Sequence, residues 1–530
     1  MAVKETVQGN SEANRAVCVR YRVASEIGAA VTRDRSGSST VVDHLPVGTV
    51  VVVAEHSTDE VQVDRVRIAA PAGWVDSQSL KTIPQSTAIG PTDEEYERLH
   101  LQPTPGDYYG LTFPPTADAL RKIGAKFLTC AFQRSGAITS ANRVTAIVDL
   151  EPVAHDGASE SYLLTVAYAF PEPGLDTDLF VKLPPTRPLS ESSKQMRFSI
   201  AKQSQAEIDL VRLARDQGFP VPTTRYYFGD YSRRSLNYIL ITERIRFGKS
   251  PIEPAYTKGR DHTIQNAAEH YRVLARAQAK LVVAHKSGAL GHDLEDLFIF
   301  RGAELGTDEV PDVEERIDRL IDIVGSRARH LFPEAATEPE FLERWREDLL
   351  FGMQHKNLVI DYLHADVDYT ALCHPNLNID NAWYWRNESD TLHTGLIDWG
   401  GAGQLSIAQA LSNMLWMPDP EVYASVRDDV LEEFLAECAS GGVYLDPATL
   451  RFHYRAAILS TQLSRHLLYT VEYLSAISEE DFRSMQDRFD PRLQESGLCS
   501  GLIWLTNVLQ EWFEQVTPGD VCRKIAGRQA

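Results

Sequence analysis

Two short motifs in the second half of the chain constrain its fold more than any other feature. The first, residues 374–381, reads HPNLNIDN, and the second, residues 397–400, reads IDWG. The residues between them read as a strand, a polar turn and a second strand, which predicts a hairpin. Asp398 follows the second strand, and the glycines behind it allow a sharp change of chain direction. The pattern predicts that Asn381 and Asp398 lie together beside this hairpin.

Asn381 and Asp398 are candidate ligands of a magnesium ion. Oxygen atoms suit this hard cation, which usually takes only one or two protein carboxylates. The alternative for Asp398 is an ordinary aspartate that caps a turn. In either case Asp398 terminates an apolar strand, where a polar side chain can face a cleft.

Composition excludes some classes of protein. The chain has 530 residues and a formal net charge of −21, which opposes non-specific binding to nucleic acid or to an anionic membrane. No apolar stretch is long enough to span a bilayer, and no apolar leader segment opens the chain. The six cysteines lack metal-type spacing, which favours reduced thiols and a cytoplasmic location.

The pattern along the chain predicts an α+β protein, with a β-rich part followed by a mainly helical part. Because a chain of 530 residues is too long for one average domain, we expect two or three domains. We expect the following division: a disordered N-terminus (1–15), a small β-barrel (16–84), a Pro-rich linker (85–117), a β-rich lobe with one internal helix (118–246), a helical lobe (247–517) and a tail (518–530).

Two charged residues of the β-rich lobe are candidates for binding phosphate groups. Lys182 ends the apolar strand that begins at Leu179, and from there it can project into a cleft. Glu207 lies 25 positions later on a predicted helix and could orient Lys182. The alternatives are an exposed edge lysine and a solvated glutamate, with Glu191 as a weaker rival partner.

The run from Leu372 to Gly403 resembles the aminoglycoside phosphotransferase and choline-kinase-like superfamily, whose pattern is H-G-D-L-H-x-x-N followed by I-D-W. The resemblance extends over about residues 118–480. It implies a two-lobed protein-kinase-like fold, with ATP and Mg²⁺ as cofactors and a hydroxylated small molecule as acceptor. It also places Glu243 and Ile245 at the hinge between the lobes, where backbone groups contact adenine.

Residues 16–84 resemble a bacterial Src-homology-3-like domain, in which a Gly-Trp-Val turn, here Gly73-Trp74-Val75, ends the barrel. This resemblance implies a peptide or protein ligand, although a spacer barrel with no ligand is the alternative. No nucleic-acid or membrane partner is expected.

The chain departs from the superfamily pattern at two positions. Gly136 is nearly alone where a phosphate-covering loop would carry several glycines, and Asn376 replaces the catalytic Asp. An amide can hydrogen-bond to a hydroxyl but cannot take its proton, and general-base help is worth roughly 10²–10⁴-fold in rate. Three hypotheses follow: a slow small-molecule phosphotransferase, a silent pseudokinase that binds nucleotide as a signal, and a scaffold that no longer binds nucleotide. The sequence does not identify the acceptor.

Overall fold

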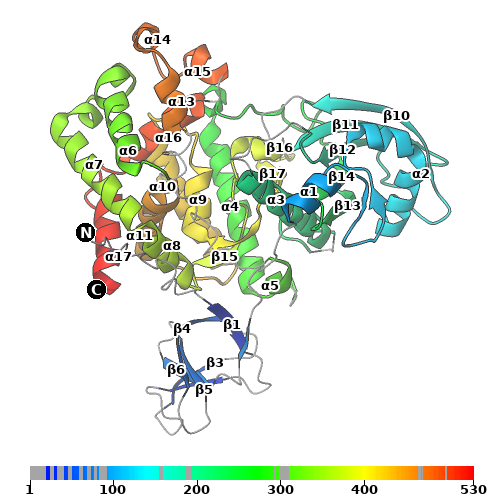
Figure 1. The fold of residues 1–530 in the computed structure, drawn as a ribbon, viewed down its shortest axis with the longest axis horizontal. Coiled ribbons are helices and arrows are strands. Elements are labelled where there is room, and N and C mark those ends of the chain that lie inside the picture. Colours follow the sequence, from blue (N-terminus) through cyan, green and yellow to red (C-terminus); the bar gives the residue numbers. More distant parts are fainter. Residues whose placement is uncertain are drawn as a thin grey trace, which may run out of the picture.

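The computed structural model describes the strands of residues 19–82 and residues 92–153, 159–186, 194–215, 218–291, 294–298, 310–462, 467, 470–495 and 498–529. Figure 1 shows an antiparallel sheet with its covering helices to one side of a larger helical region. The predicted α+β order, β-rich and then helical, is confirmed. Among these residues, no helix has the length and hydropathy needed to cross a membrane.

Strands β1–β7 precede the linker and form an antiparallel sheet in the order β3-β2-β6-β5-β4-β1-β7. Their bounds are Val19–Val23, Ala29–Thr32, Val41–Leu45, Val50–Thr58, Asp64–Ile68, Gly73–Asp76 and Leu80–Thr82. Residues 1–18 and the connections between these strands lie outside the described part of the chain. The disordered N-terminus, the closed barrel and its ligand therefore stay predictions.

The predicted linker contains secondary structure and packs on the sheet that follows. Its elements are α1 (Asp93–Leu99), β8 (Thr104–Pro105) and β9 (Thr112–Phe113). The Asp230 carboxylate accepts hydrogen bonds from the backbone N–H groups of Tyr108 and Tyr109, at 2.9 and 3.0 Å. Because Asp230 is fully buried, these bonds fix the segment to the edge of the sheet.

The central sheet has the strand order β10-β11-β12-β14-β13. The strands are β10 (Val144–Val153), β11 (Glu160–Tyr168), β12 (Asp178–Leu183), β13 (Tyr226–Ser232) and β14 (Asn237–Glu243). In β12, Leu179, Val181 and Leu183 share a buried core with helix α2 (Ala117–Ser135). Side chains alternate along a strand, so Lys182 points to the opposite face, where helix α3 (Lys194–Leu213) lies.

The region after β14 is mainly helical and is built around α4, which packs against α10 and β15. Its helices are η3 (Asp261–Thr263), α4 (Ala267–Lys286), α5 (Leu294–Leu297), α6 (Val313–Asp322), η4 (Ile323–Arg327), η5 (Arg329–Leu331), η6 (Glu334–Thr337), α7 (Pro339–Gln354), α8 (Lys356–Ala365), α9 (Ile407–Met414), α10 (Tyr423–Ser440), α11 (Pro447–Ala457), η8 (Ile458–Gln462), α13 (Thr470–Ala476), α14 (Glu479–Ser484), α15 (Pro491–Glu495), α16 (Leu498–Gln510) and α17 (Pro518–Gln529).

Two strand pairs interrupt the helices at the predicted motifs. Strand β15 (Thr370–Cys373) pairs with β18 (Gly403–Ser406), and β16 (Ala382–Arg386) pairs with β17 (Leu392–Leu396). The short helix η7 (Ile379–Asn381) joins β15 to the hairpin. The hairpin predicted between the two motifs is therefore confirmed.

The structure corrects the predicted tail at residues 518–530. Pro518 to Gln529 form helix α17, which packs on α7, α8 and α11. Val521, Cys522 and Ile525 are buried, and Arg523 pairs with the buried carboxylate of Asp348 at 2.6 Å. The sequence reasoning missed this helix because the segment is short and its apolar positions are few.

Candidate phosphotransfer site

Lys182 is the centre of a charged cluster built from three separate parts of the chain. Its Nζ donates to Glu207 Oε1 at 2.8 Å, to Glu207 Oε2 at 3.0 Å and to Asp398 Oδ1 at 2.6 Å. The side chains of Lys182 and Glu207 are 15% and 8% exposed, whereas that of Asp398 is 49% exposed. One ammonium group therefore joins a buried glutamate to an aspartate that remains open to solvent.

The ionisation of the cluster follows from burial and from these contacts. Burial opposes the charge on Lys182, but the carboxylates of Asp398 and Glu207 together raise its pKa above the ordinary value. The charge of Lys182 lowers the pKa of Asp398 to about 2. Burial raises the pKa of Glu207 although Lys182 opposes this, and the backbone N–H of Trp399 also donates to the Glu207 carboxylate.

Asp398 has an uncommon backbone conformation. Its φ is +58°, in the left-handed region that residues other than glycine rarely adopt. Gly401, three residues later, also has a positive φ of 77°, and its N–H donates to the Gln203 carbonyl of α3 at 3.2 Å. The loop after β17 is thus bent sharply and bonded to the helix that carries Glu207, which directs Asp398 toward Lys182.

His374 connects the two motifs. Its ring is fully buried, Nδ1 accepts from the Asn376 N–H at 3.2 Å, and Nε2 donates to the Ile397 carbonyl at 3.0 Å. Burial lowers the pKa of His374 to about 4, so the neutral ring can serve as both acceptor and donor at neutral pH. This position agrees with a structural role for His374.

The amide of Asn381 is oriented by the backbone of Asn376. Asn381 Nδ2 donates to the Asn376 carbonyl at 2.6 Å, and the Ile397 N–H donates to the Asn381 carbonyl at 3.1 Å. The second contact brings Asn381 beside the strand end that carries Asp398. Within the described part of the chain, Asn381 Oδ1 accepts no hydrogen bond, so it is available to a cation.

Asn381 and Asp398 each have a side-chain oxygen of the kind that magnesium takes as a ligand. Lys182 occupies Asp398 Oδ1, which leaves Oδ2 of this half-exposed carboxylate. The described residues contain no group of three or more His, Cys, Asp or Glu side chains that could hold a metal. Mg²⁺ does not require such a group, because it keeps several water or phosphate oxygens among its ligands.

Asn376 has a side chain that is already engaged. Its Oδ1 accepts from Asn378 Nδ2 at 2.6 Å, and Asn378 itself is buried. No described residue accepts a hydrogen bond from the Asn376 NH₂ group, which can donate a hydrogen bond but cannot accept a proton.

Glu243 and Ile245 lie at the junction between the sheet and the helical region. Glu243 ends β14, and its carboxylate accepts from the Arg225 N–H at 2.8 Å. In the register of β12 and β14, Lys182 faces Leu240, so Glu243 lies about 10 Å along the strand from the level of Lys182. Ile245 begins the connection that follows. Their contact with adenine at a hinge stays a prediction.

Gly136 is not part of this cluster. It ends helix α2 with a φ of 76°, and its N–H donates to the carbonyls of Phe132 and Gln133. Among the described residues, no contact joins Gly136 to Lys182. A phosphate-covering role for Gly136 therefore stays a prediction.

A second group of charged residues, not predicted to belong to the site, lies near Asp398. Asp380 in η7 has a buried Oδ1 with no hydrogen-bond partner among the described residues. Burial raises the pKa of Asp261 to about 7, with Asp380 adding to the shift, and Tyr271 donates its hydroxyl hydrogen to Asp261. Lys258 favours the charged forms of Asp261, Asp380 and Asp398. Asp261 and Lys258 lie in a long connection that carries no recognisable pattern.

No family model matches this chain, and no curated protein matches it. Solved structures similar to it include a choline/ethanolamine kinase family protein from Mesorhizobium loti, with 13% identity over 72% of this chain and 93% of that one, at a TM-score of 0.34. A GDP and kanamycin complex of APH(2")-IIia has 13% identity over 72% and 97% of the chains, also at 0.34. An ethanolamine kinase of Plasmodium vivax has 10% identity over 76% and 93%, again at 0.34. At such TM-scores, the assignment of the site rests on its own geometry.

Proposed function

We propose that this protein is an ATP- and Mg²⁺-dependent phosphotransferase of protein-kinase-like fold that acts on a hydroxyl group of a small molecule. The observation that carries the proposal is the position of Lys182 between Glu207 and Asp398, with bonds of 2.8 and 2.6 Å. The three residues come from a strand, a helix and a loop far apart in the sequence. A buried lysine between two carboxylates is costly to build, which favours a role in binding.

Each residue of the cluster has a role in this proposal. Lys182 contacts the phosphates of the nucleotide, and Glu207 holds its ammonium in position. Asn381 and Asp398 hold Mg²⁺, which supplies positive charge against the phosphate oxygens. Phosphoryl transfer depends mainly on such positioning and charge neutralisation, so this set supplies most of what the reaction needs.

The acceptor hydroxyl is proposed to lie against Asn376. The amide NH₂ group can position the hydroxyl oxygen, but the proton must leave without help from this residue. The loss of general-base help slows transfer by roughly 10²–10⁴-fold. The proposed enzyme is therefore slow unless its acceptor supplies its own base.

Calorimetric titration of the full chain with Mg-ATP, and separately with Mg-GTP, tests the proposal. We expect Asp398→Ala to weaken Mg²⁺-dependent binding at least tenfold, or about 1.4 kcal/mol. Asp118→Ala is a matched control, because that carboxylate is 96% exposed and lies on α2, away from the cluster. Failure of the unmodified protein to bind either nucleotide would refute the proposal and favour the scaffold hypothesis.

A catalytically silent pseudokinase is the second candidate. The observation that favours it is Asn376 itself, whose Oδ1 is already bonded to Asn378. In that case nucleotide binding would be intact, transfer to any acceptor would be absent, and the predicted barrel would recruit a protein partner. Nucleotide binding without ADP production under any acceptor condition would decide in favour of this candidate.

A further inference from the structure

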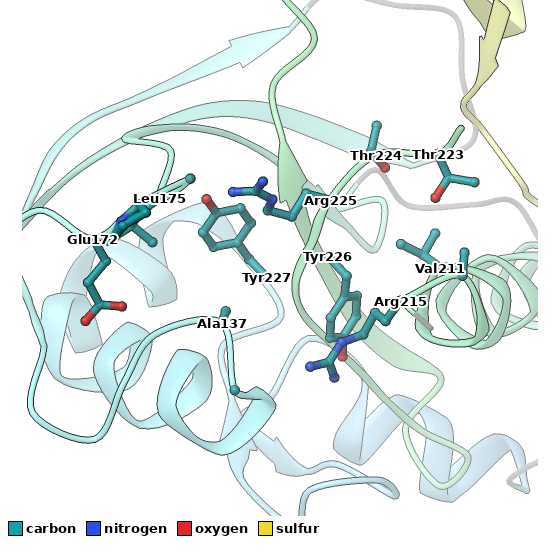
Figure 2. Close-up of a pocket in the computed structure, with 14 residues that line it drawn as sticks. Ala137, Glu172, Leu175, Val211, Arg215, Thr223, Thr224, Arg225, Tyr226 and Tyr227 are labelled. Atoms are coloured by element: carbon teal, nitrogen blue, oxygen red, sulfur yellow. The ribbon is translucent and has the colours of Figure 1, made fainter. Parts of the chain in front are cut away.

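A cavity of about 360 Å³ lies at the opposite end of the sheet from the Lys182 end of β12. Its walls come from the end of α2, the β11–β12 connection, the end of α3 and the start of β13 (Figure 2). None of the residues that line it belongs to the phosphotransfer site described above. Its volume falls in the range of roughly 300–1,000 Å³ that is typical of small-molecule sites.

Two guanidinium groups line this cavity. Figure 2 shows Arg225 beside the ring of Tyr227 and Arg215 beside the ring of Tyr226. The Arg215 guanidinium carbon is 5.1 Å from the Tyr226 ring centre, and Nη2 donates to the Ser135 carbonyl at 2.6 Å. These contacts fix the planar group without neutralising its charge, since Arg215 forms no ion pair with any described residue.

Acidic groups lie beside the second guanidinium, that of Arg225. Arg225 Nη1 is 3.8 Å from Asp176 Oδ2, and the Arg225 side chain is 52% exposed. Glu172 also lines the cavity, but its carboxylate accepts hydrogen bonds from the N–H and the hydroxyl of Thr139, at 3.3 and 2.6 Å. Arg225 is thus paired with an acidic group, whereas the Arg215 guanidinium is a cation of the lining that forms no ion pair with a described residue.

We propose that this cavity binds a small organic anion with a carboxylate or phosphate group, and that the bound anion regulates the phosphotransfer site. Guanidinium groups match the oxygen geometry of both groups and bind them through paired N–H bonds. The hydroxyls of Thr223 and Thr224 line the same cavity and add polar contacts for such a ligand.

The regulatory half of the proposal rests on the continuity of the cavity walls with the cluster. Val211 lines the cavity one helical turn beyond Glu207 on α3. Thr223 forms a parallel bridge with Leu396, two residues before Asp398. A ligand that holds these walls in one arrangement therefore acts on the helix that carries Glu207 and on the strand that leads to Asp398.

A second connection leads from the cavity to the predicted hinge. The Arg225 N–H donates to the Glu243 carboxylate at 2.8 Å, and the Glu243 N–H donates to the Arg225 carbonyl at 2.9 Å. A ligand changes the affinity of another site only through its own preference for one arrangement of the walls. The binding half of the proposal is independent of the proposed function, whereas the regulatory half depends on it.

Calorimetry of the full chain with inorganic phosphate and, separately, with citrate tests the binding half, with ionic strength matched by KCl. We expect saturable binding of at least one probe, weakened at least tenfold in Arg215→Ala/Arg225→Ala and partly restored in Arg215→Lys/Arg225→Lys. The matched control is Arg234→Ala, whose side chain is 74% exposed in the turn between β13 and β14. The two probes distinguish a phosphate ligand from a carboxylate ligand.

The phosphotransfer site could itself bind phosphate, so a second variant separates the two sites. In Lys182→Met/Glu207→Gln, the charged pair of that site is removed, and binding in the cavity should persist. Binding that is lost in this variant but retained in Arg215→Ala/Arg225→Ala would overturn the proposal. The proposal would also be overturned if neither phosphate nor citrate saturates the protein at about 10 mM. That concentration is ten times the weakest Kd that we expect for the cavity, about 1 mM.

The regulatory half is tested by titrating Mg-ATP in the presence and absence of the saturating probe. We expect the nucleotide affinity to change at least about fivefold, and to stay constant in Arg215→Ala/Arg225→Ala. Unchanged nucleotide affinity with the probe bound would refute regulation while leaving the binding site. If the unmodified protein binds no nucleotide, the proposed function fails with the regulatory half, and the phosphate and citrate titrations still decide the binding half.

Discussion

Replacing Lys182 by methionine should destabilise the protein more than replacing its buried partner. The ammonium is the only charged partner that Glu207 has among the described residues, at 2.8 Å, and the glutamate side chain is 8% exposed. Removing one partner of a buried ion pair leaves an uncompensated charge and costs about 3–5 kcal/mol. Glu207→Gln leaves Lys182 with Asp398 at 2.6 Å, so we expect a smaller loss of about 1–3 kcal/mol.

The cost of Lys182→Met should depend on pH. Burial already raises the pKa of Glu207, and loss of Lys182 raises it further above the unfolded value of about 4.3. A group whose folded pKa is raised contributes stability that is fully present below the unfolded pKa and is lost as the pH rises through the folded pKa. The destabilisation should therefore be greater at pH 8 than at pH 5.

Urea unfolding at pH 5 and pH 8, followed by tryptophan fluorescence, measures these differences. Trp399 is a buried reporter that contacts the cluster directly. The double variant Lys182→Met/Glu207→Gln should be more stable than Lys182→Met alone, because it contains no unpaired charge at Glu207. Lys280→Met, on the exposed face of α4, is the control and should change the free energy of unfolding by less than about 0.5 kcal/mol. The reasoning would be refuted if Lys182→Met lost the same free energy of unfolding at pH 5 and pH 8. It would also be refuted if the double variant were less stable than Lys182→Met.

Three further results are expected. Asn376→Asp should raise Mg²⁺-dependent ATP hydrolysis by roughly 10²–10⁴-fold in an ADP-release assay. The control Asn387→Asp, in the nearby hairpin turn, should leave the rate unchanged. Equal rates for Asn376→Asp and the unmodified protein would contradict the role proposed for residue 376. Deleting residues 518–530 should lower the free energy of unfolding by at least about 3 kcal/mol in urea, because helix α17 carries buried side chains and the cation paired with a buried aspartate. Asp261→Asn should be more stable than the unmodified protein at pH 8 but not at pH 5 in thermal melts, because the pKa of about 7 means that stability is lost as the pH rises through that value.

Local pattern was sufficient to predict how Lys182, Asn381 and Asp398 are placed by their strands. The alternation along β12 requires the residue between two buried apolar side chains to face the other way, so Lys182 could be placed from the strand alone. Asn381 and Asp398 flank a hairpin, and the hairpin brings its two ends together whatever surrounds it. Such short-range geometry is contained in the sequence.

The parts that sequence reasoning missed depend on contacts between distant segments. Gly136 lines the cavity at the other end of the sheet from Lys182, and the strand order that separates them is not fixed by local pattern. Asp261 reaches the site through a connection with no periodic signal, held by its bond to Tyr271. Helix α17 is short, and its stability comes from packing on helices much earlier in the chain.

The geometry around Asn376 separates the construction of the site from its chemistry. Its backbone carbonyl holds the amide of Asn381, and its backbone N–H bonds to His374, so neither contact depends on the side chain. Its Oδ1 accepts from Asn378, which a carboxylate oxygen could accept equally well. An aspartate and an asparagine at this position therefore organise the same loop. They differ only in the second terminal atom of the side chain, which is a nitrogen in asparagine and an oxygen in aspartate. For this reason a site can keep Lys182 and its carboxylates in place while the rate of proton removal changes greatly, and nucleotide binding and turnover must be measured separately.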